Sequence, residues 1–198
     1  MARRRLRQTA SQYLERPLAR LLARLHLHPN AITLAGLLLS GGVGYLLSQG
    51  WFLAGGLLLL LAGLMDMLDG ALARLTGAAS TTGALIDSVA DRLSEAAVFL
   101  GLLWFYSLEG NTGAVVATYA ALTFSFMVSY LRARAESLGE SGEVGLATRP
   151  ERVVLLIVGL VLGSLVAREA VTVTLWVLAA LAALTAGQRL LHFLRRSR

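Results

Sequence analysis

The aspartates of this chain lie close together in an otherwise apolar sequence. All of them fall within one stretch, at Asp66, Asp69, Asp87 and Asp91. Helical residues three or four apart share a face, so this spacing predicts two pairs of carboxylates, each pair on one side of a helix. Burying a single carboxylate in a bilayer is costly. Two such pairs therefore indicate a bound cation and a chemical task.

The segment between the two pairs is expected to bring them together. Residues 75–82 consist mainly of Gly, Ala, Ser and Thr, which predicts a tight turn between two antiparallel helices. At about 1.5 Å rise per residue, Asp69 and Asp87 should lie at a similar depth below this turn. Asp66 and Asp91 should then face each other deeper in the hairpin. The sequence thus predicts that all these carboxylates converge on one point.

Converging carboxylates cannot all be ionised unless cations are present, because like charges repel. Two divalent ions balance the formal charge, and ligands that are all oxygens favour Mg²⁺ or Mn²⁺. A pair of metal ions stabilises both the entering and the leaving oxygen in phosphoryl transfer. The small residues Gly70, Ala73 and Gly83 leave room for a bulky ligand, and Arg74 can bind a phosphate through two N–H groups. The pattern therefore indicates metal-dependent phosphate chemistry.

Two alternative roles for the acids involve different chemistry. In the first, the acids pair with Arg74 and Arg92 and hold helices together, but two cations do not neutralise four anions. In the second, the acids mark a cation or proton pathway through a transporter. The acids cluster at one depth, however, and do not form a chain across the bilayer. A purely structural scaffold would show no dependence on metal.

The rest of the chain indicates a membrane protein. Of its 198 residues, 56% are hydrophobic and 15% are charged, below the roughly 25% of soluble domains. Apolar runs that suit a membrane-spanning helix occur at 31–49, 51–75, 83–108, 112–135, 152–167 and 170–191. We therefore expect an all-α, polytopic membrane protein, with six transmembrane helices forming one catalytic domain over residues 29–198.

The basic residues predict how this protein lies in the membrane. Lysine is absent, and outside the expected spans the arginines lie on one side, with Arg168 as the exception. The positive-inside rule makes that side cytoplasmic and places both termini there. We expect a multi-pass protein of the cell membrane, with its active site on the cytoplasmic side. Such sidedness is not expected of a nucleic-acid-binding patch, and the absence of cysteine excludes thiol chemistry.

The N-terminal residues 1–28 have an amphipathic pattern. Arginines recur at every fourth position over 16–24, and leucines form a separate stripe. This predicts an interfacial helix on the cytoplasmic leaflet, or one packed on the protein's own cytoplasmic face. Pro29 should restrict His28 to an extended conformation, and Asn30 is expected to cap the first transmembrane helix.

The aspartate region resembles the signature of the CDP-alcohol phosphotransferase family of membrane enzymes. It reads Asp66-x-x-Asp69-Gly70-x-x-Ala73-Arg74, then Gly83-x-x-x-Asp87-x-x-x-Asp91, and matches without gap or substitution. The six spans, the amphipathic N-terminal helix and Pro29-Asn30-x-x-Thr33 are also similar to the family. The resemblance implies an enzyme that transfers the phosphatidyl group of CDP-diacylglycerol to an alcohol and releases CMP. It also implies a homodimer.

The resemblance implies a role for each signature residue. Two divalent cations, Mg²⁺ or Mn²⁺, would be bound by Asp66, Asp69, Asp87 and Asp91. Asp91 would also be the catalytic base that takes the proton from the attacking hydroxyl. The CDP-lipid would be bound by Gly70, Ala73, Arg74 and Gly83.

A second polar region lies near the cytoplasmic ends of the fourth and fifth expected spans. Arg132 should converge with Arg149 or Arg152 beside the metals, and several arginines around a cavity suit an acceptor that carries a phosphate. Each arginine alone is equally well explained as the positive charge that commonly flanks membrane helices.

The same region resembles the phosphatidylinositol-phosphate synthase branch of the family. The similarity lies in the run from Ser129 to Glu136 and in Arg149-Pro150-Glu151-Arg152, although Arg132 and Pro150 depart from the branch pattern. It implies inositol 1-phosphate as the acceptor, with its phosphate bound by Ser129, Arg132, Arg149 and Arg152. Glycerol 3-phosphate, as in a phosphatidylglycerophosphate synthase, is an alternative acceptor. An archaetidylinositol-phosphate synthase, which uses an ether lipid, is another alternative.

Overall fold

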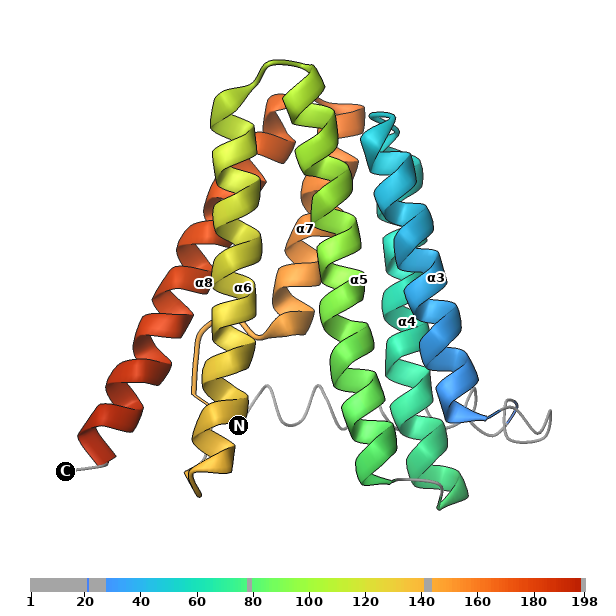
Figure 1. Ribbon diagram of the computed structural model, residues 1–198. Helices are drawn as coiled ribbons and strands as arrows, with labels where there is room; N and C mark the ends of the chain where they lie inside the picture. The colour runs from blue at the N-terminus through green and yellow to red at the C-terminus, as the bar shows by residue number, and fades with distance from the viewer. Residues whose placement is uncertain (1–20, 22–27, 78–79, 141–143, 197–198) are drawn as a thin grey trace.

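The computed structural model describes residues 21, 28–77, 80–140 and 144–196, and these form six long helices. They are α3 (Pro29–Ser48), α4 (Phe52–Thr76), α5 (Thr81–Leu108), α6 (Thr112–Ser137), α7 (Arg149–Leu165) and α8 (Glu169–Arg196). Figure 1 shows them side by side, joined by turns at alternating ends. No strand occurs among the described residues, so the expected all-α architecture is confirmed.

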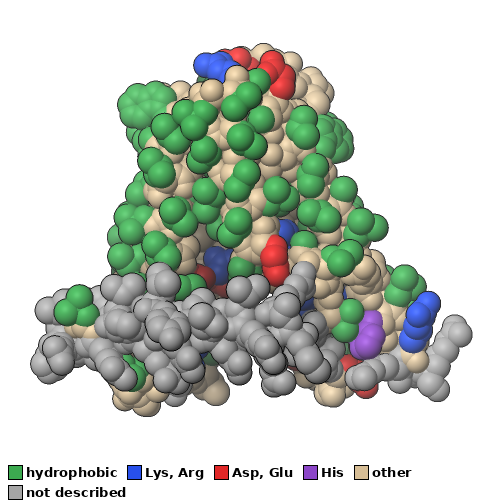
Figure 2. Space-filling model, turned by 180° about the vertical axis from the view of Figure 1, so that it is seen from behind, with side chains coloured by type: hydrophobic (Ala, Val, Ile, Leu, Met, Phe, Trp, Pro, Cys, Tyr) green, Lys and Arg blue, Asp and Glu red, His purple; other side chains and the backbone are tan. Residues whose placement is uncertain are grey.

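The helices identify a multi-pass membrane protein. Four of the helices are both long enough and apolar enough to cross a membrane, namely α3, α4, α6 and α8. Figure 2 shows hydrophobic side chains spread over the outer surface, with charged groups at the top and in the lower part. The α7 helix has only 17 residues, and the 28 residues of α5 include several acids and an arginine.

The start of α3 differs in one detail from the sequence-based expectation. His28 is extended, with φ −75° and ψ 137°, as predicted from the proline that follows it. The helix already begins at Pro29, however, and His28 occupies the N-cap without a side-chain hydrogen bond. The predicted capping role of Asn30 is therefore wrong, because proline is favoured at the first helical position and opens the helix one residue earlier. The predicted interfacial helix of residues 1–28 lies almost entirely outside the described residues.

The predicted turn between α4 and α5 is present. Gly77 ends α4 in the left-handed conformation, with φ 67°, which glycine adopts without steric cost. Ser80 is the N-cap of α5, and its Oγ accepts a hydrogen bond from the Gly83 N–H at 3.0 Å. These two caps produce the short antiparallel hairpin that carries the aspartates.

Close packing of α3 against α5 sets the orientation of α5. A Cβ atom on Gly44 would clash with the backbone oxygen of Ala97, and one on Gly101 would clash with the backbone of Gly44. Small residues of this kind let membrane helices approach until their backbones touch. The contact therefore determines which face of α5 remains available for the site.

The other helices place α7 next to this hairpin. The α3 helix packs against both α4 and α5, α6 packs against α5 and α8, and α7 packs against α4 and α8. In Figure 1, α5 and α6 separate toward the lower end of the bundle, and α7 begins part of the way up the bundle. The first turn of α7 therefore lies level with the aspartate-bearing turns of α4 and α5, some distance from the ends of these helices.

Candidate active site

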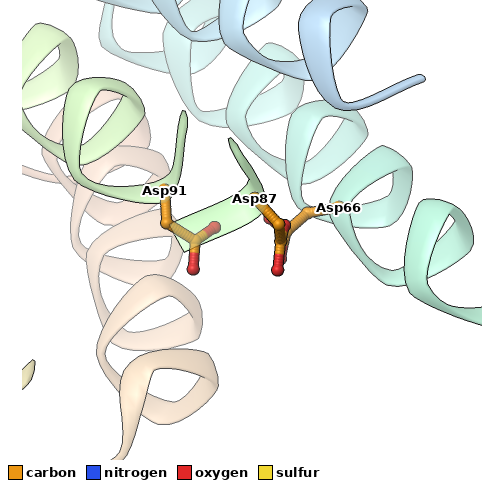
Figure 3. Close-up of side chains that lie close together, drawn as sticks. All are labelled: Asp66, Asp87 and Asp91. Atoms are coloured by element: carbon orange, nitrogen blue, oxygen red, sulfur yellow. The ribbon is translucent and has the colours of Figure 1, made fainter. Parts of the chain in front are cut away.

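Three of the predicted carboxylates come together between α4 and α5. Asp66, Asp87 and Asp91 each place one carboxylate oxygen within 4.8 Å of the others, and all three are partly buried (Figure 3). A site that contains only oxygens at this separation suits a hard divalent cation such as Mg²⁺ or Mn²⁺. The residues present therefore fit the metal chemistry that the sequence predicts.

Asp69 lies beside this group but faces α3. Its side chain is only 4% exposed, and its Oδ2 accepts a hydrogen bond from the Thr33 hydroxyl at 2.6 Å. Its Oδ1 accepts from the Gly70 N–H at 2.5 Å. Three residues of helix rotate Asp69 by about 60° from Asp66, which turns it toward α3. It still interacts electrostatically with Asp66 and Asp87, so it belongs to the same charged region.

Arg149 connects the first turn of α7 to the carboxylates. Its Nη1 lies 3.1 Å and 2.9 Å from the two oxygens of Asp66, and it also forms an ion pair with Asp91. Asp91 has a second ion pair with the neighbouring Arg92, at 3.1 Å. The arginine predicted to bind the acceptor phosphate is thus directly at the candidate metal site.

Arg152, the other predicted α7 arginine, is buried with an acidic partner. It is 4% exposed, and its Nη2 lies 3.5 Å from Oε1 of Glu95. Its Nη1 donates to the backbone oxygen of Ala147 at 3.1 Å. The sequence analysis missed Glu95, although it lies four residues after Asp91 and extends the same helical face of α5.

The remaining two predicted acceptor residues lie on α6. The Ser129 hydroxyl donates to the Ser125 carbonyl at 3.2 Å. Arg132 is about half exposed and pairs with Glu136 through a 2.8 Å contact. The structure therefore divides the predicted acceptor residues between α6 and the first turn of α7.

A further arginine, on α8, was missed by the sequence analysis. Arg189 donates to the carbonyls of Val144, at 2.7 Å, and Val128, at 2.5 Å, and is almost fully buried. It interacts electrostatically with Arg132 and Arg152. Its position inside the last apolar run was the available signal, because a charge within a membrane helix is usually functional. Arginines from α6, α7 and α8 thus form one positive region.

The predicted CDP-lipid residues lie toward the turn of the same hairpin. A Cβ atom on Gly70 would lie 3.4 Å from the Arg74 guanidinium, so this arginine covers the glycine. A Cβ on Gly83 would lie 3.1 Å from Ser80 Oγ. Ala73, which lies between these two glycines in the sequence, is partly buried. The neighbouring Arg74 is exposed. Small residues and an arginine thus occupy the end of the hairpin nearest the turn.

Known proteins share both the sequence and the fold. The family model for CDP-alcohol phosphatidyltransferase matches residues 26–187. A phosphatidylinositol phosphate synthase of Mycobacterium marinum is 38% identical over 179 residues, which cover 88% of this chain and 76% of that protein. A protein of the same name from Corynebacterium glutamicum is 36% identical over 183 residues, covering 91% and 84%.

Solved structures agree with these relatives. The crystal structure of Mycobacterium tuberculosis phosphatidylinositol phosphate synthase with CDP-DAG bound has a TM-score of 0.83 and 35% identity, covering 91% of this chain and 93% of that chain. A second structure of that synthase, in complex with manganese and citrate, also has a TM-score of 0.83 and is 36% identical, covering 90% and 88%. The family match extends over most of the chain and includes the aspartate pattern, so the chain is a member of the CDP-alcohol phosphatidyltransferase family.

Proposed function

We propose that this membrane enzyme transfers the phosphatidyl group of CDP-diacylglycerol to inositol 1-phosphate and produces phosphatidylinositol phosphate and CMP. One observation carries the proposal: Arg149 joins the carboxylates of Asp66 and Asp91 to the arginine-bearing first turn of α7. A cation-binding group and a phosphate-binding group are thus adjacent. The names of the relatives, and the CDP-DAG bound in one solved structure, support the same donor and product.

The carboxylates have two tasks in this reaction. Asp66, Asp87 and Asp91, together with Asp69, would hold two divalent cations, Mg²⁺ or Mn²⁺. When bound, these ions neutralise the diphosphate and stabilise the charge that develops on its oxygens. Asp91 takes the proton of the acceptor hydroxyl as that oxygen forms a bond to the phosphorus that bears the lipid. The bond between this phosphorus and the CMP oxygen breaks, and CMP leaves with the electron pair.

The arginines and small residues position the two substrates. Gly70, Ala73, Arg74 and Gly83 would receive the cytidine diphosphate part of the lipid. Ser129, Arg132, Arg149 and Arg152 would bind the acceptor phosphate, and Arg189 extends the same positive region. Arginine suits this task because its planar guanidinium binds two phosphate oxygens at once. Proximity of the two bound substrates then lowers the barrier to transfer.

The orientation in the membrane forms part of the proposal. We infer that α5 and α7 also cross the bilayer, because they run beside four helices that are long and apolar enough to do so. With 28 residues, α5 spans about 42 Å, so its charged first half can extend beyond the hydrocarbon core of about 30 Å. The arginine-rich end, with the active site and both termini, would face the cytoplasm. Residues 1–28 would lie on that leaflet, and the enzyme would act as a homodimer.

A direct assay tests the proposed function. Purified protein is incubated with CDP-diacylglycerol, Mg²⁺ and inositol 1-phosphate, and both CMP release and the lipid product are measured. We expect CMP and phosphatidylinositol phosphate in equal amounts. Faster turnover with glycerol 3-phosphate than with inositol 1-phosphate would identify glycerol 3-phosphate as the acceptor, and the protein would still be a transferase. Absence of CMP with either acceptor would contradict the transferase itself.

A further inference from the structure

A buried ion pair joins α5 to α7 beside the candidate active site. It links Glu95, whose side chain is 11% exposed, with Arg152, which is 4% exposed. Removing charged groups from water is costly, and the attraction within a buried pair often does no more than offset that cost. A contribution to stability alone is therefore a weak reason for this pair to exist.

The pair continues the contacts that hold the active site together. Glu95 lies one helical turn beyond Asp91, and Arg152 lies one turn beyond Arg149. Arg149 pairs with Asp91, and Arg152 pairs with Glu95. Two consecutive acids of α5 are thus matched to two consecutive arginines of α7. Glu95 interacts electrostatically with both arginines.

The buried positive charge of Arg152 requires a negative charge nearby. Arg92 and Arg149 both repel it electrostatically, and it is almost fully buried. Glu95 supplies the compensating charge, while the Ala147 carbonyl accepts one further hydrogen bond. In the described part of the chain, the buried Nε of Arg152 has no hydrogen-bond acceptor. The guanidinium is thus held by the ion pair with Glu95 and the hydrogen bond to Ala147, and it retains one donor without an acceptor among the described residues, which suits the binding of an oxyanion.

We propose that Glu95 is a positioning residue for the acceptor site. It keeps the Arg152 guanidinium beside the carboxylates of α5, oriented to bind the phosphate of the acceptor alcohol. This inference rests on the proposed function, because it assigns Glu95 to the acceptor and not to the CDP-lipid. Glu95 acts through Arg152 and need not touch either substrate.

The first test separates the two substrates kinetically. Glu95→Gln keeps the size of the side chain and removes its charge. We expect the KM for inositol 1-phosphate to rise on the order of tenfold, as is common when the partner that orients a binding residue is lost. The KM for CDP-diacylglycerol should hardly change. Glu95→Asp, which retains the charge on a shorter side chain, should give an intermediate KM for the acceptor.

A matched control lies at the other end of α5. Glu109, the C-cap of α5, pairs with Arg168 at 3.9 Å, far along the helix from the aspartates. Glu109→Gln removes the same charge from another glutamate–arginine pair and should change neither KM. Thermal unfolding in detergent shows whether each variant is folded. If Glu95→Gln does not fold, a selective rise in the acceptor KM of Glu95→Asp supports the proposal, and its absence overturns it.

A double variant tests whether Glu95 acts through Arg152. Residues that act as one unit show non-additive effects. Once Arg152→Gln is present, Glu95→Gln should therefore raise the acceptor KM no further. If the effects of the two substitutions on the acceptor KM are fully additive, Glu95 does not act through Arg152 and the positioning role is overturned. An equal rise of both KM values in Glu95→Gln would overturn it as well. Neither result would change the activity proposed for the wild-type protein. Wild-type protein that releases no CMP with inositol 1-phosphate or glycerol 3-phosphate would instead contradict the proposed function, and this inference with it.

Discussion

The Arg149 guanidinium lies 2.9 Å from Oδ2 of Asp66, a residue 83 positions earlier in the chain. The same Nη1 also pairs with Asp91 on the neighbouring helix. One side chain from α7 thus contacts carboxylates of both α4 and α5. This makes the aspartate group and the arginine group parts of one polar site, because a partly buried cluster of carboxylates needs positive charge nearby. The following predictions test that site and the fold that positions it.

Asp91→Asn should abolish CMP release without unfolding the protein. The substitution removes the proposed base, and general bases typically contribute about 10²–10⁴-fold to the rate. Initial rates at saturating substrate measure the loss, and the thermal unfolding midpoint checks the fold. Glu109→Gln, at the far end of α5 from the aspartates, removes an acid outside the proposed site and serves as the comparison. Undiminished turnover in Asp91→Asn would show that another group takes the proton.

Activity should require a divalent cation. A chelator such as EDTA should stop CMP release, and added Mg²⁺ or Mn²⁺ should restore it, because the oxygen-only site favours hard cations. Titration calorimetry of the wild-type protein measures how many ions bind. Asp87→Asn should raise the metal concentration needed for half-maximal activity. Full activity in the presence of the chelator would argue against a metal-dependent mechanism.

Thr33→Val should weaken metal binding through Asp69. The valine keeps the shape of threonine but removes the hydroxyl that donates to Asp69 at 2.6 Å. Losing such an orienting hydrogen bond typically reduces metal affinity about 10–100-fold. Thr33→Ser retains the hydroxyl and should behave like the wild type. Equal metal affinity in the valine and serine variants would indicate that Asp69 does not take part in metal binding.

Gly44→Ala should destabilise the protein more than Gly41→Ala. A methyl group at Gly44 meets the backbone of Ala97, whereas one at Gly41 has no atom within 4 Å. Overpacking of this kind typically costs about 1–3 kcal/mol. The added alanine at Gly41 should be neutral or slightly stabilising, because glycine is unfavourable within helices. Thermal unfolding in the same detergent compares the two; equal midpoints would contradict the close α3–α5 contact.

Single cysteines should reveal the orientation in the membrane. The chain contains no cysteine, so each introduced thiol is labelled without background. In intact cells, a membrane-impermeant maleimide should label Gln49→Cys and Asn111→Cys, which lie in turns at one end of the bundle. It should not label Gly139→Cys, at the opposite end, until the membrane is permeabilised. The reverse pattern would place the active site outside the cell.

The sequence by itself determined the membrane class, the helices and the chemical type of the site. Apolar runs predicted α3 to α8 closely, because hydrophobicity and helix breaks are local properties. The spacing of the aspartates predicted that Asp66 meets Asp87 and Asp91, since helical periodicity and a short turn are enough to bring these three together. It also pointed to oxygen-bound divalent metals through the type of residue alone.

Only the tertiary structure decided how each polar side chain is partnered. Sequence spacing gives the angle between residues on one helix, but the rotation of a helix against its neighbours depends on packing such as that of Gly44 on Gly101. For this reason Asp69 turned out to face Thr33, and the Glu95–Arg152 pair was not foreseen. These partners are distant in sequence, and their proximity follows from the way the helices pack together.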